Sequence, residues 1–317
     1  MGSSPFALPC LHQLFEKGYE IIGVITQPDK PSGRGQALQA PPVKKRAHEL
    51  HLPVYQPKSL KADETQALVN ALSPDMIIVV AYGKILPPWL LQFPRFGCIN
   101  LHGSILPKYR GAAPVHWAIA NGENKTGVCT MLLDEGLDTG PVFLCEETHI
   151  RPEETAPDLY GRLAEIGASL MLATVEGMIN GTLEPKPQDD SKATLAPILK
   201  KEHGFMDWNM PAIAIHNRVR AFNPWPGTVT RFRAMTCRIL KTSPPSSGLS
   251  APSSGNGKGL AGSIVVSKGS LKVLCGDSAL LEIVSIQPEN RKAVSGADFA
   301  NGARIQADEK FQSLMDN

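Results

Sequence analysis

The segment from Gly97 to Pro114, GCINLHGSILPKYRGAAP, constrains the fold more than any other part of the chain. It begins as an apolar run and then breaks into a turn of Gly, Ser and Pro residues. Side chains alternate between the two faces of a strand, so Asn100 and His102 are predicted to share one face while Leu101 packs on the other. An amide and an imidazole would then emerge together at the carboxyl end of a strand, where open α/β sheets place their ligands.

Apolar runs of strand length alternate with helix-like segments over residues 1–183. The run DMIIVVAYG, at 75–83, is nearly all apolar, which suits a central parallel strand covered on both faces. Asp63 is expected to cap the helix at 62–72. The alternation predicts an α/β domain with a doubly wound parallel sheet. The other expected strands are 20–26, 126–134 and 141–150, and the other expected helices are 5–17 and 155–182.

The pattern of predicted helices and strands changes after residue 183. Residues 184–205 are predicted to be a linker, and 206–317 a second domain whose five short strand-like runs suggest a small OB-like β-barrel. The Ser/Pro/Gly-rich stretch 243–259 is expected to be a disordered insertion. Residues 200–241 contain eight Lys or Arg residues and two acidic ones, which indicates either a solvated basic face or a phosphate-binding surface.

The composition of the chain constrains its fold and function less than these sequence patterns do. A hydrophobic content of 42%, a charged content of 20% and a net charge of +2 are ordinary for a globular protein and favour no particular partner. The six cysteines form no C-x-x-C pair, so buried free thiols in a reducing compartment are expected, with Cys98 and Cys129 in the core. No segment approaches the ~20 apolar residues of a membrane span, and the start MGSSPFALPC lacks the features of a signal or transit peptide.

Four motifs together closely resemble the methionyl-tRNA formyltransferases. They are CINLHGSILPKYRGAAP, the downstream LDEGLDTGP, the early QPDKPSGRG and AFNPWPG at 221–227. The resemblance covers nearly the whole chain. It implies a Rossmann-like formyltransferase domain followed by the OB-like domain. It also implies transfer of the formyl group of 10-formyltetrahydrofolate to the amino group of methionine on initiator tRNA, without a metal.

The catalytic residues that the resemblance implies are Asn100, His102 and Asp138. The amide and the imidazole would donate hydrogen bonds to the formyl oxygen, and Asp138 would accept the proton of the amine and orient the imidazole. Taken singly, each has a structural alternative: a structural histidine at a strand end, an Asn turn former and an Asp turn cap. Their joint occurrence in two specific motifs favours the site.

A folate pocket is implied beside the same strand end. Its expected residues are Val80, Ala81, Tyr82, Gly83, Ser104, Leu106 and Pro107. Nearby Ile85, Leu86 and Trp89 are expected to be core residues rather than ligand contacts. Lys108 and Arg110 would either contact the folate tail or the tRNA end, or lie solvated at the surface.

The tRNA partner would meet two regions. The loop 27–42 would enter the acceptor end of the tRNA and help select the initiator. The basic second domain would contact phosphate and sugar along the acceptor arm. The expected contacts are Lys30 and Arg34 in the loop, and Arg218, Arg220, Arg231, Arg233 and Lys241 in the second domain. The enzyme is expected to act as a monomer.

Two departures from the family pattern stand out. Family members open with an apolar strand leading into G-T-P-x-F-A, whereas this chain keeps only GSSPFA at 2–7. We therefore expect the first strand of the sheet to be missing, as in a truncated gene model or splice form, and the neighbouring strand edges to be unpaired. Second, Gln36 and Ala37 follow the GRG triplet where many relatives have lysines. The electrostatic attraction of this loop for tRNA is therefore expected to be weaker.

Three other functions fit the same motifs less well. They are a formyltransferase for a sugar nucleotide, a formyltetrahydrofolate hydrolase, and a catalytically impaired form that only binds folate or RNA. The expected compartment is the mitochondrial matrix or a plastid in a eukaryote, or the cytoplasm in a bacterium. The Ser/Pro/Gly insertion slightly favours the organelle.

Overall fold

The computed structural model describes residues 1–32, 37–245, 260–267, 269–306 and 308–314, and it divides into two compact units. The first unit comprises Met1–Pro114, Lys125–His149 and Pro157–Pro197, and the second comprises Val115–Asn124, Ile150–Ala156 and Ile198–Asn317. The domain boundaries at 183 and 205 stay predictions. Most of the insertion predicted at 243–259 lies outside the described residues.

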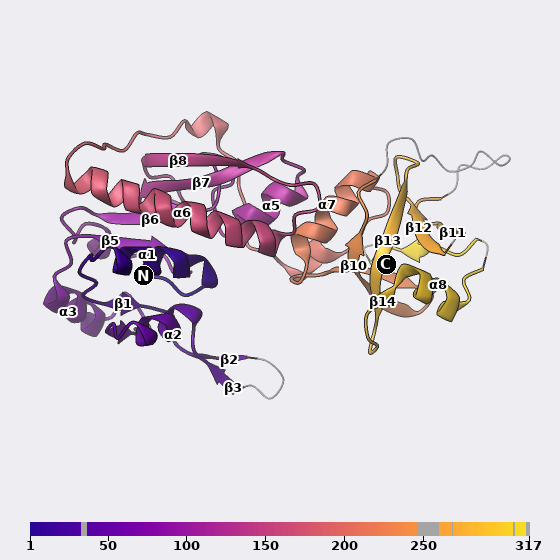
Figure 1. The fold of residues 1–317 in the computed structure, drawn as a ribbon, viewed down its shortest axis with the longest axis horizontal. Coiled ribbons are helices and arrows are strands. Elements are labelled where there is room, and N and C mark those ends of the chain that lie inside the picture. Colours follow the sequence, from indigo (N-terminus) through magenta and orange to yellow (C-terminus); the bar gives the residue numbers. More distant parts are fainter. Residues whose placement is uncertain (33–36, 246–259, 268, 307, 315–317) are drawn as a thin grey trace. The chain divides into compact units, whose positions relative to one another are not determined.

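The first unit is an α/β structure (Figure 1). Its larger sheet has the order β5 (Ile77–Val80), β6 (Cys98–His102), β7 (Lys125–Leu132), β8 (Val142–His149). The α/β class is confirmed, but the expectation of an all-parallel sheet is wrong. Only β5 and β6 run parallel, while β7 is antiparallel to both of its neighbours. The loop between β7 and β8 is too short for the crossover that parallel strands require.

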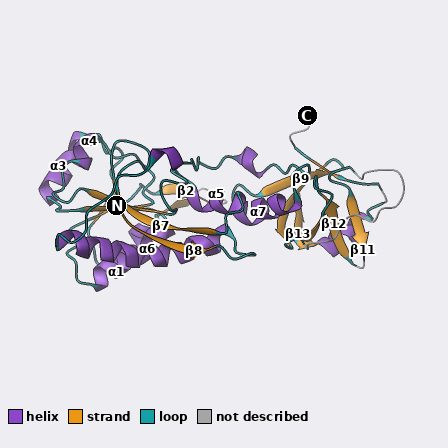
Figure 2. Ribbon diagram, turned by 90° about the horizontal axis from the view of Figure 1, so that it is seen from above, coloured by secondary structure: helices purple, strands orange, loops and turns teal. Residues whose placement is uncertain are grey.

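Helices cover this sheet, and α1 and α6 lie along one side of it (Figure 2). An ideal Cβ on Gly167 of α6 would stand 2.5 Å from Leu101 Cδ2, so helix and strand approach as closely as glycine permits. Leu101 therefore faces α6, and alternation turns Asn100 and His102 to the other face, as predicted. The helices of this unit are α1 (Leu8–Glu16), α2 (Pro42–Glu49), α3 (Asp63–Leu72), α4 (Pro88–Leu91) and α6 (Ala156–Ile179), with short 3-10 turns at Pro5–Ala7 and Asp190–Lys192.

The start of the chain lies between two sheets. β1 (Val24–Ile25) pairs in parallel with β4 (Val54–Tyr55) and does not pair with β5. Gly2 N donates to Ile25 O (3.0 Å) and Val80 N donates to Met1 O (2.9 Å), so Met1 and Gly2 bridge the facing edges. Next to this bridge is a largely apolar pocket of about 710 Å³. Met1 and Gly2 therefore partner part of both edges, so the expectation that these edges are left unpaired is wrong for the groups that they bind.

Two local expectations are wrong. Asp63 does not cap α3, because the N-cap position is Ala62 and Asp63 is the first helical residue, where its charge favours the helix dipole. Cys129 is not a free thiol but forms a disulfide with Cys145. The two residues lie directly opposite each other on β7 and β8, a register that cysteine spacing alone does not reveal. The other cysteines that the structure describes, at 10, 98, 237 and 275, are buried and free.

The loop expected at 27–42 contains a short antiparallel hairpin of β2 (Lys30–Ser32) and β3 (Ala37–Gln39). Asp29 anchors its base, because its carboxylate accepts from Lys44 Nζ (2.9 Å) and Gln56 Nε2 (2.8 Å). The hydrogen bonds from Gln56 and Lys44 lower the pKa of Asp29. Arg34 lies outside the described residues.

The second unit is built on an antiparallel sheet of order β11-β12-β13-β10-β9-β15, with β14 paired to β13. This agrees with the predicted run of short strands separated by turns. No helix in the described part of either unit is long and apolar enough to cross a membrane. The strands are β9 (Thr228–Phe232), β10 (Met235–Thr242), β11 (Ile264–Ser267), β12 (Ser270–Leu274), β13 (Leu280–Pro288), β14 (Val294–Ser295) and β15 (Phe311–Gln312). The helices are α5 (Pro114–Ala120), α7 (Ala212–Phe222) and α8 (Gly296–Ala303), with a 3-10 turn at Lys201–Gly204.

An aromatic cluster forms the centre of this second core. The Phe232 ring lies 5.4 Å from that of Phe299 and 5.6 Å from that of Phe311, and the Trp208 ring stacks 5.7 Å from Phe311. Phe232 is 1% exposed. Because it contacts two of the other rings, its removal would leave a cavity that the neighbours cannot close.

We expect Phe232→Ala to lower the free energy of unfolding of this unit by about 3–5 kcal/mol, the usual cost of truncating a buried aromatic residue. Chemical denaturation followed by tryptophan fluorescence would measure the change. The matched control is Ile213→Ala on α7, whose side chain is 52% exposed. Its expected cost is below about 0.5 kcal/mol. Equal losses in the two variants would contradict the assignment of Phe232 to the core.

A buried histidine makes the second unit sensitive to acid. His216 on α7 is 3% exposed, and its Nδ1 lies 2.8 Å from Thr242 Oγ1. Burial lowers the pKa of His216, and this effect outweighs the backbone of Pro152, which raises the pKa. The folded unit therefore keeps this imidazole neutral at a pH where the unfolded chain binds a proton.

Stability is expected to fall as the pH drops below about 6.5, where a histidine of the unfolded chain becomes protonated, by up to about 1.4 kcal/mol per pH unit. Urea denaturation of the protein and of His216→Gln, at a series of pH values between 7.5 and 5, would measure this. The variant should lose less stability over that range. An identical pH dependence of the two proteins would contradict the prediction.

Candidate active site at the carboxyl end of β6

The last residues of β6 carry the polar groups of the candidate site. Asn100 lies in register between Val79 of β5 and Met131 of β7, and its side chain is half-buried. His102, two residues on, is 5% exposed. Both side chains leave the sheet on the face opposite α6, so the strand delivers an amide and an imidazole to one place.

The surroundings of His102 determine which ring nitrogen is available for chemistry. Its Nε2 lies 2.9 Å from Tyr109 O. A carbonyl oxygen can only accept a hydrogen bond, so Nε2 carries a proton and donates it. Nδ1 then faces Asp138, at 3.6 Å from Oδ2. The ring is held at one nitrogen and exposes the other to the carboxylate.

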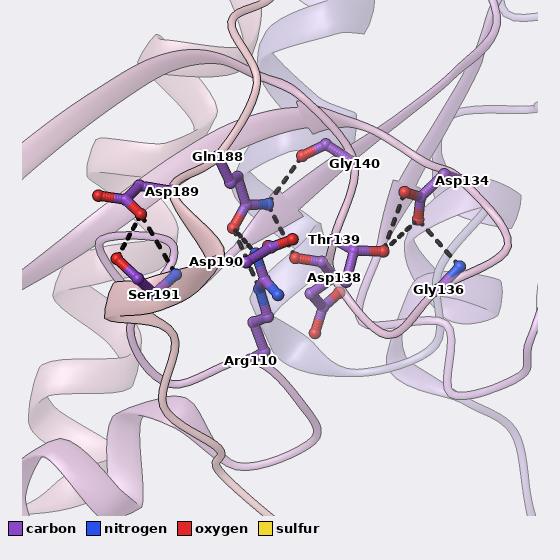
Figure 3. Close-up of polar contacts among 10 residues, drawn as sticks. All are labelled: Arg110, Asp134, Gly136, Asp138, Thr139, Gly140, Gln188, Asp189, Asp190 and Ser191. Atoms are coloured by element: carbon purple, nitrogen blue, oxygen red, sulfur yellow. Dashed lines mark hydrogen bonds and ion pairs between the residues drawn. The ribbon is translucent and has the colours of Figure 1, made fainter.

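Asp138 lies in the loop between β7 and β8 and is brought to His102 by the turn that it occupies. Its Oδ2 accepts a hydrogen bond from Gly111 N at 2.7 Å, and its φ of +53° is unusual for a residue with a side chain. The loop is shaped by Asp134, which accepts from Gly136 N (3.0 Å) and from Thr139 Oγ1 (2.8 Å) (Figure 3). The structure therefore brings the three predicted catalytic residues to one edge of the sheet.

The loop that follows β6 folds back over the strand end. Ser104 is fully buried and its Oγ donates to Lys108 O at 2.6 Å. Leu106 is 7% exposed and packs in a small cluster with Cys129 and Met131. Pro107 O accepts from Thr194 N at 3.3 Å. Of the loop residues predicted for the folate pocket, Leu106 therefore packs against β7, while Ser104 and Pro107 are bound to Lys108 and Thr194.

The residues after β5 form the neighbouring wall. Val80 is buried, whereas Ala81 and Gly83 are exposed and have φ values of +46° and +78°. The Tyr82 hydroxyl is buried without a hydrogen-bond partner among the described residues, and burial raises the pKa of Tyr82 to about 12. Ile85 is 88% exposed, so the prediction that it is a core residue is wrong. The same prediction is confirmed for Leu86, which is 7% exposed.

Two polar residues support the turn of Asp138, a role that the sequence did not indicate for either. Arg110 is 6% exposed, so the alternative of a solvated surface position is wrong. Its guanidinium donates to Gln188 Oε1 and Asp190 Oδ1, in the segment predicted to be a linker (Figure 3). Gln188 in turn contacts the turn of Asp138. A single glutamine in a Pro-rich segment carries no sequence signal of such a contact.

The predicted tRNA-binding residues of the second unit fall into two groups. Arg220 donates to Asn217 Oδ1 and Glu154 O, and Arg218 lies over the Phe222 ring. Burial lowers the pKa of both guanidinium groups. Arg233 forms a two-point ion pair with Glu309. By contrast, Arg231 is half-buried and Lys241 is exposed at the surface. In the first unit, Lys30 is exposed on β2.

No metal site emerges from the described residues, since they contain no group of three or more His, Cys, Asp or Glu side chains that could hold an ion. The candidate site therefore consists of an amide, an imidazole and a carboxylate beside a partly apolar surface. Such groups can polarise a carbonyl and accept a proton.

Comparison with known proteins identifies the class. The profile described as formyl transferase matches residues 1–175, and the profile described as formyl transferase, C-terminal domain, matches residues 198–304. The chain therefore belongs to the formyl transferase family.

The curated relatives indicate which members of the formyl transferase family the chain resembles. A methionyl-tRNA formyltransferase of Solibacter usitatus is 45% identical over 311 residues, covering 98% of this chain and 97% of the relative. The methionyl-tRNA formyltransferase of a Synechococcus strain is 43% identical over 320 residues, covering 99% and 98%. Within the formyl transferase family, the chain is thus similar along its whole length to methionyl-tRNA formyltransferases.

Solved structures share the fold. The sugar 3N-formyl transferase WlaRD superimposes with a TM-score of 0.64 at 18% identity, over 92% of this chain and 97% of that one. An N-formyltransferase from Helicobacter canadensis also has a TM-score of 0.64 at 18% identity, over 89% and 96%. At this identity the likeness shows the fold alone.

Proposed function

We propose that this protein transfers the formyl group of 10-formyltetrahydrofolate to the amino group of methionyl initiator tRNA. The observation that carries the proposal is the pairing of His102 Nδ1 with Asp138 Oδ2 at 3.6 Å, next to Asn100 at the end of β6. The whole-length likeness to methionyl-tRNA formyltransferases supports the same reaction. The formyl donor supplies the carbon that is transferred, and its N10 leaves as an amine.

The residues of the site have distinct roles in this reaction. The amine nitrogen attacks the formyl carbon, the bond from that carbon to N10 breaks, and one proton must pass from the attacking nitrogen to N10. Asn100 donates from its amide to the formyl oxygen, whose negative charge grows during the attack. His102 faces the site with Nδ1, because Nε2 donates to Tyr109 O, so the expected hydrogen bond from the imidazole to the formyl oxygen requires the doubly protonated ring. Asp138 accepts the amine proton, directly or through water, and holds the imidazole.

The surface beside these residues fits a folate. Ala81 and Gly83 are exposed at the carboxyl end of β5, and Ile85 presents an apolar side chain to solvent. Tyr82 lies between Ala81 and Gly83 and is buried, with its hydroxyl unpartnered among the described residues. An apolar surface of this kind beside polar groups suits a flat ring with a polar edge. We assign Val80 to Gly83, with Ser104, Leu106 and Pro107, to this pocket.

Asp138→Asn is expected to lower kcat by about 100- to 10,000-fold, because the amide keeps the shape but cannot accept the proton. Folate affinity should change less than twofold, since the substitution leaves the β5 wall intact. Formyl-methionine released from the tRNA by mild alkaline hydrolysis measures the rate, and fluorescence quenching measures folate binding. A variant that retains the parental kcat would remove Asp138 from the chemistry.

The tRNA is proposed to contact the outer face of β9 and β10. Buried and half-buried residues alternate along β9, so Arg231 points away from the core. Arg238 lies in register with Val229 on that same outer side and is exposed, and Lys241 is exposed at the end of β10. The cationic groups of Arg220 and Arg233 are held within the unit, which favours these three residues as phosphate contacts.

Replacing Arg231, Arg238 and Lys241 together with Ala is expected to weaken tRNA binding and to lower the slope of log affinity against log salt by about 2–3, roughly one for each phosphate-binding side chain removed. Filter binding at several salt concentrations measures both. The matched control removes Lys272, Arg291 and Lys292, three charges elsewhere in the same unit. An equal effect of the two triple variants would make the outer face of β9 and β10 incidental.

A sugar nucleotide remains the main alternative acceptor, because the solved structures with the same fold include formyltransferases for sugars. Assays of the purified protein with methionyl-tRNA and with an amino-sugar nucleotide separate the two. Release of formate without either acceptor would indicate a hydrolase, and folate binding without turnover would indicate an impaired form. The bacterial sources of the curated relatives favour the cytoplasm over an organelle. We propose a monomer as the active form.

A further inference from the structure

The turn that carries Asp138 is held by a residue far away in the sequence. Gln188 Nε2 donates to the carbonyl oxygens of Asp138, at 2.8 Å, and of Gly140, at 2.7 Å (Figure 3). These two carbonyls belong to the residues on either side of Thr139. Asp138 has a φ of +53°, in the left-handed region that residues with a side chain adopt uncommonly, and contacts from neighbouring residues help to hold it there. The glutamine provides two such contacts.

Gln188 is itself fixed by Arg110. Its Oε1 accepts from Arg110 Nε at 3.1 Å and from Nη2 at 2.8 Å, and Nη2 also reaches Asp190 Oδ1 at 2.6 Å. A guanidinium can only donate, so the glutamine oxygen must face the arginine and the amide nitrogen must face the two carbonyls. The orientation of the amide group is therefore determined by its partners.

The same segment also holds the other side of the catalytic pair. Arg110 N donates to Thr194 O at 2.9 Å, and Arg110 O accepts from Ala196 N at 2.7 Å. Its neighbour Gly111 donates to Asp138 Oδ2, and an ideal Cβ on Gly111 would stand 2.7 Å from Ala196 O. Residues 188–196 thus hold both the turn of Asp138 and the stretch after Tyr109, whose carbonyl binds His102.

We propose that Gln188 is a positioning residue for formyl transfer. It touches neither substrate nor reacting atoms. It acts through Asp138, because its two hydrogen bonds set the backbone of the turn and so direct the carboxylate toward His102 Nδ1. Misplacement of a catalytic group by about 1 Å can cost on the order of 100-fold in rate. This inference rests on the proposed function only for its kinetic readout.

The first test is Gln188→Glu. The side chain keeps its shape and can still accept from Arg110, but an oxygen replaces the nitrogen that donates to the two carbonyls. We expect kcat to fall about 10- to 100-fold, with KM for methionyl-tRNA and for 10-formyltetrahydrofolate unchanged within about twofold. The matched control is Ser191→Ala, whose side chain bonds only to Asp189 among the described residues and should leave kcat at the parental value. A rise in KM with an unchanged kcat would overturn the proposal.

A double-mutant cycle separates positioning from a general structural effect. If Gln188 acts through Asp138, then Gln188→Glu should lower the residual rate of Asp138→Asn less than about twofold. Full additivity of the two losses would overturn the proposal. Should Gln188→Glu fail to fold, Gln188→Met supplies the same cycle, since it removes both donors without adding a charge.

Hydrogen exchange tests the inference independently of the reaction. Gln188→Glu or Gln188→Met is expected to speed exchange of the backbone amides of residues 138–140 about tenfold or more, while the Ser191→Ala control leaves them unchanged. If the protein does not formylate methionyl-tRNA, the proposed function fails and exchange alone decides the role of Gln188. Unchanged exchange in that turn would overturn the positioning role even in an active enzyme.

Discussion

The packing of Leu101 against α6 is the contact on which the candidate site depends. It sets the phase of β6, because a strand that buries one side chain on the helix face must present its neighbours on the other. The glycine at position 167 permits this close approach, since a Cβ there would overlap Leu101. A shift of β6 by one residue would place Asn100 and His102 under the helix. Helix packing therefore determines where the amide and imidazole emerge.

From that strand end outward, the site is built mainly of main-chain contacts. Tyr109 O holds one nitrogen of His102, and Gly111 N holds the carboxylate of Asp138. Both partners are main-chain groups, so substituting the side chain of Tyr109 or Gly111 would not remove either hydrogen bond directly. The geometry depends on how the loops after β6 and β7 are folded. Arg110 and Gln188 matter because they tie those two loops together.

The sequence allowed some of this to be predicted. The local pattern of the apolar run ending in Asn100 and His102 was enough to predict a strand and the side chains on each of its faces. The catalytic role of Asp138 was predicted from the family resemblance. The antiparallel direction of β7 and β8 and the pairing of Cys129 with Cys145 depend on register between strands, which no local pattern encodes. For Arg110 the sequence left both a ligand contact and a solvated position open, because its buried partners, Gln188 and Asp190, lie about 80 residues further along the chain.

The backbone of Met1 and Gly2 ties together the two sheets of the first unit that contain β1 and β5. Gly2 N donates to Ile25 O of β1, while Met1 N donates to Ile78 O and Met1 O accepts from Val80 N of β5. An ideal Cβ on Gly2 would stand 2.7 Å from Val80 O, so only glycine fits between the strands at this point. A larger residue at position 2 would therefore push the two sheets apart and loosen β5, the strand that lies beside β6.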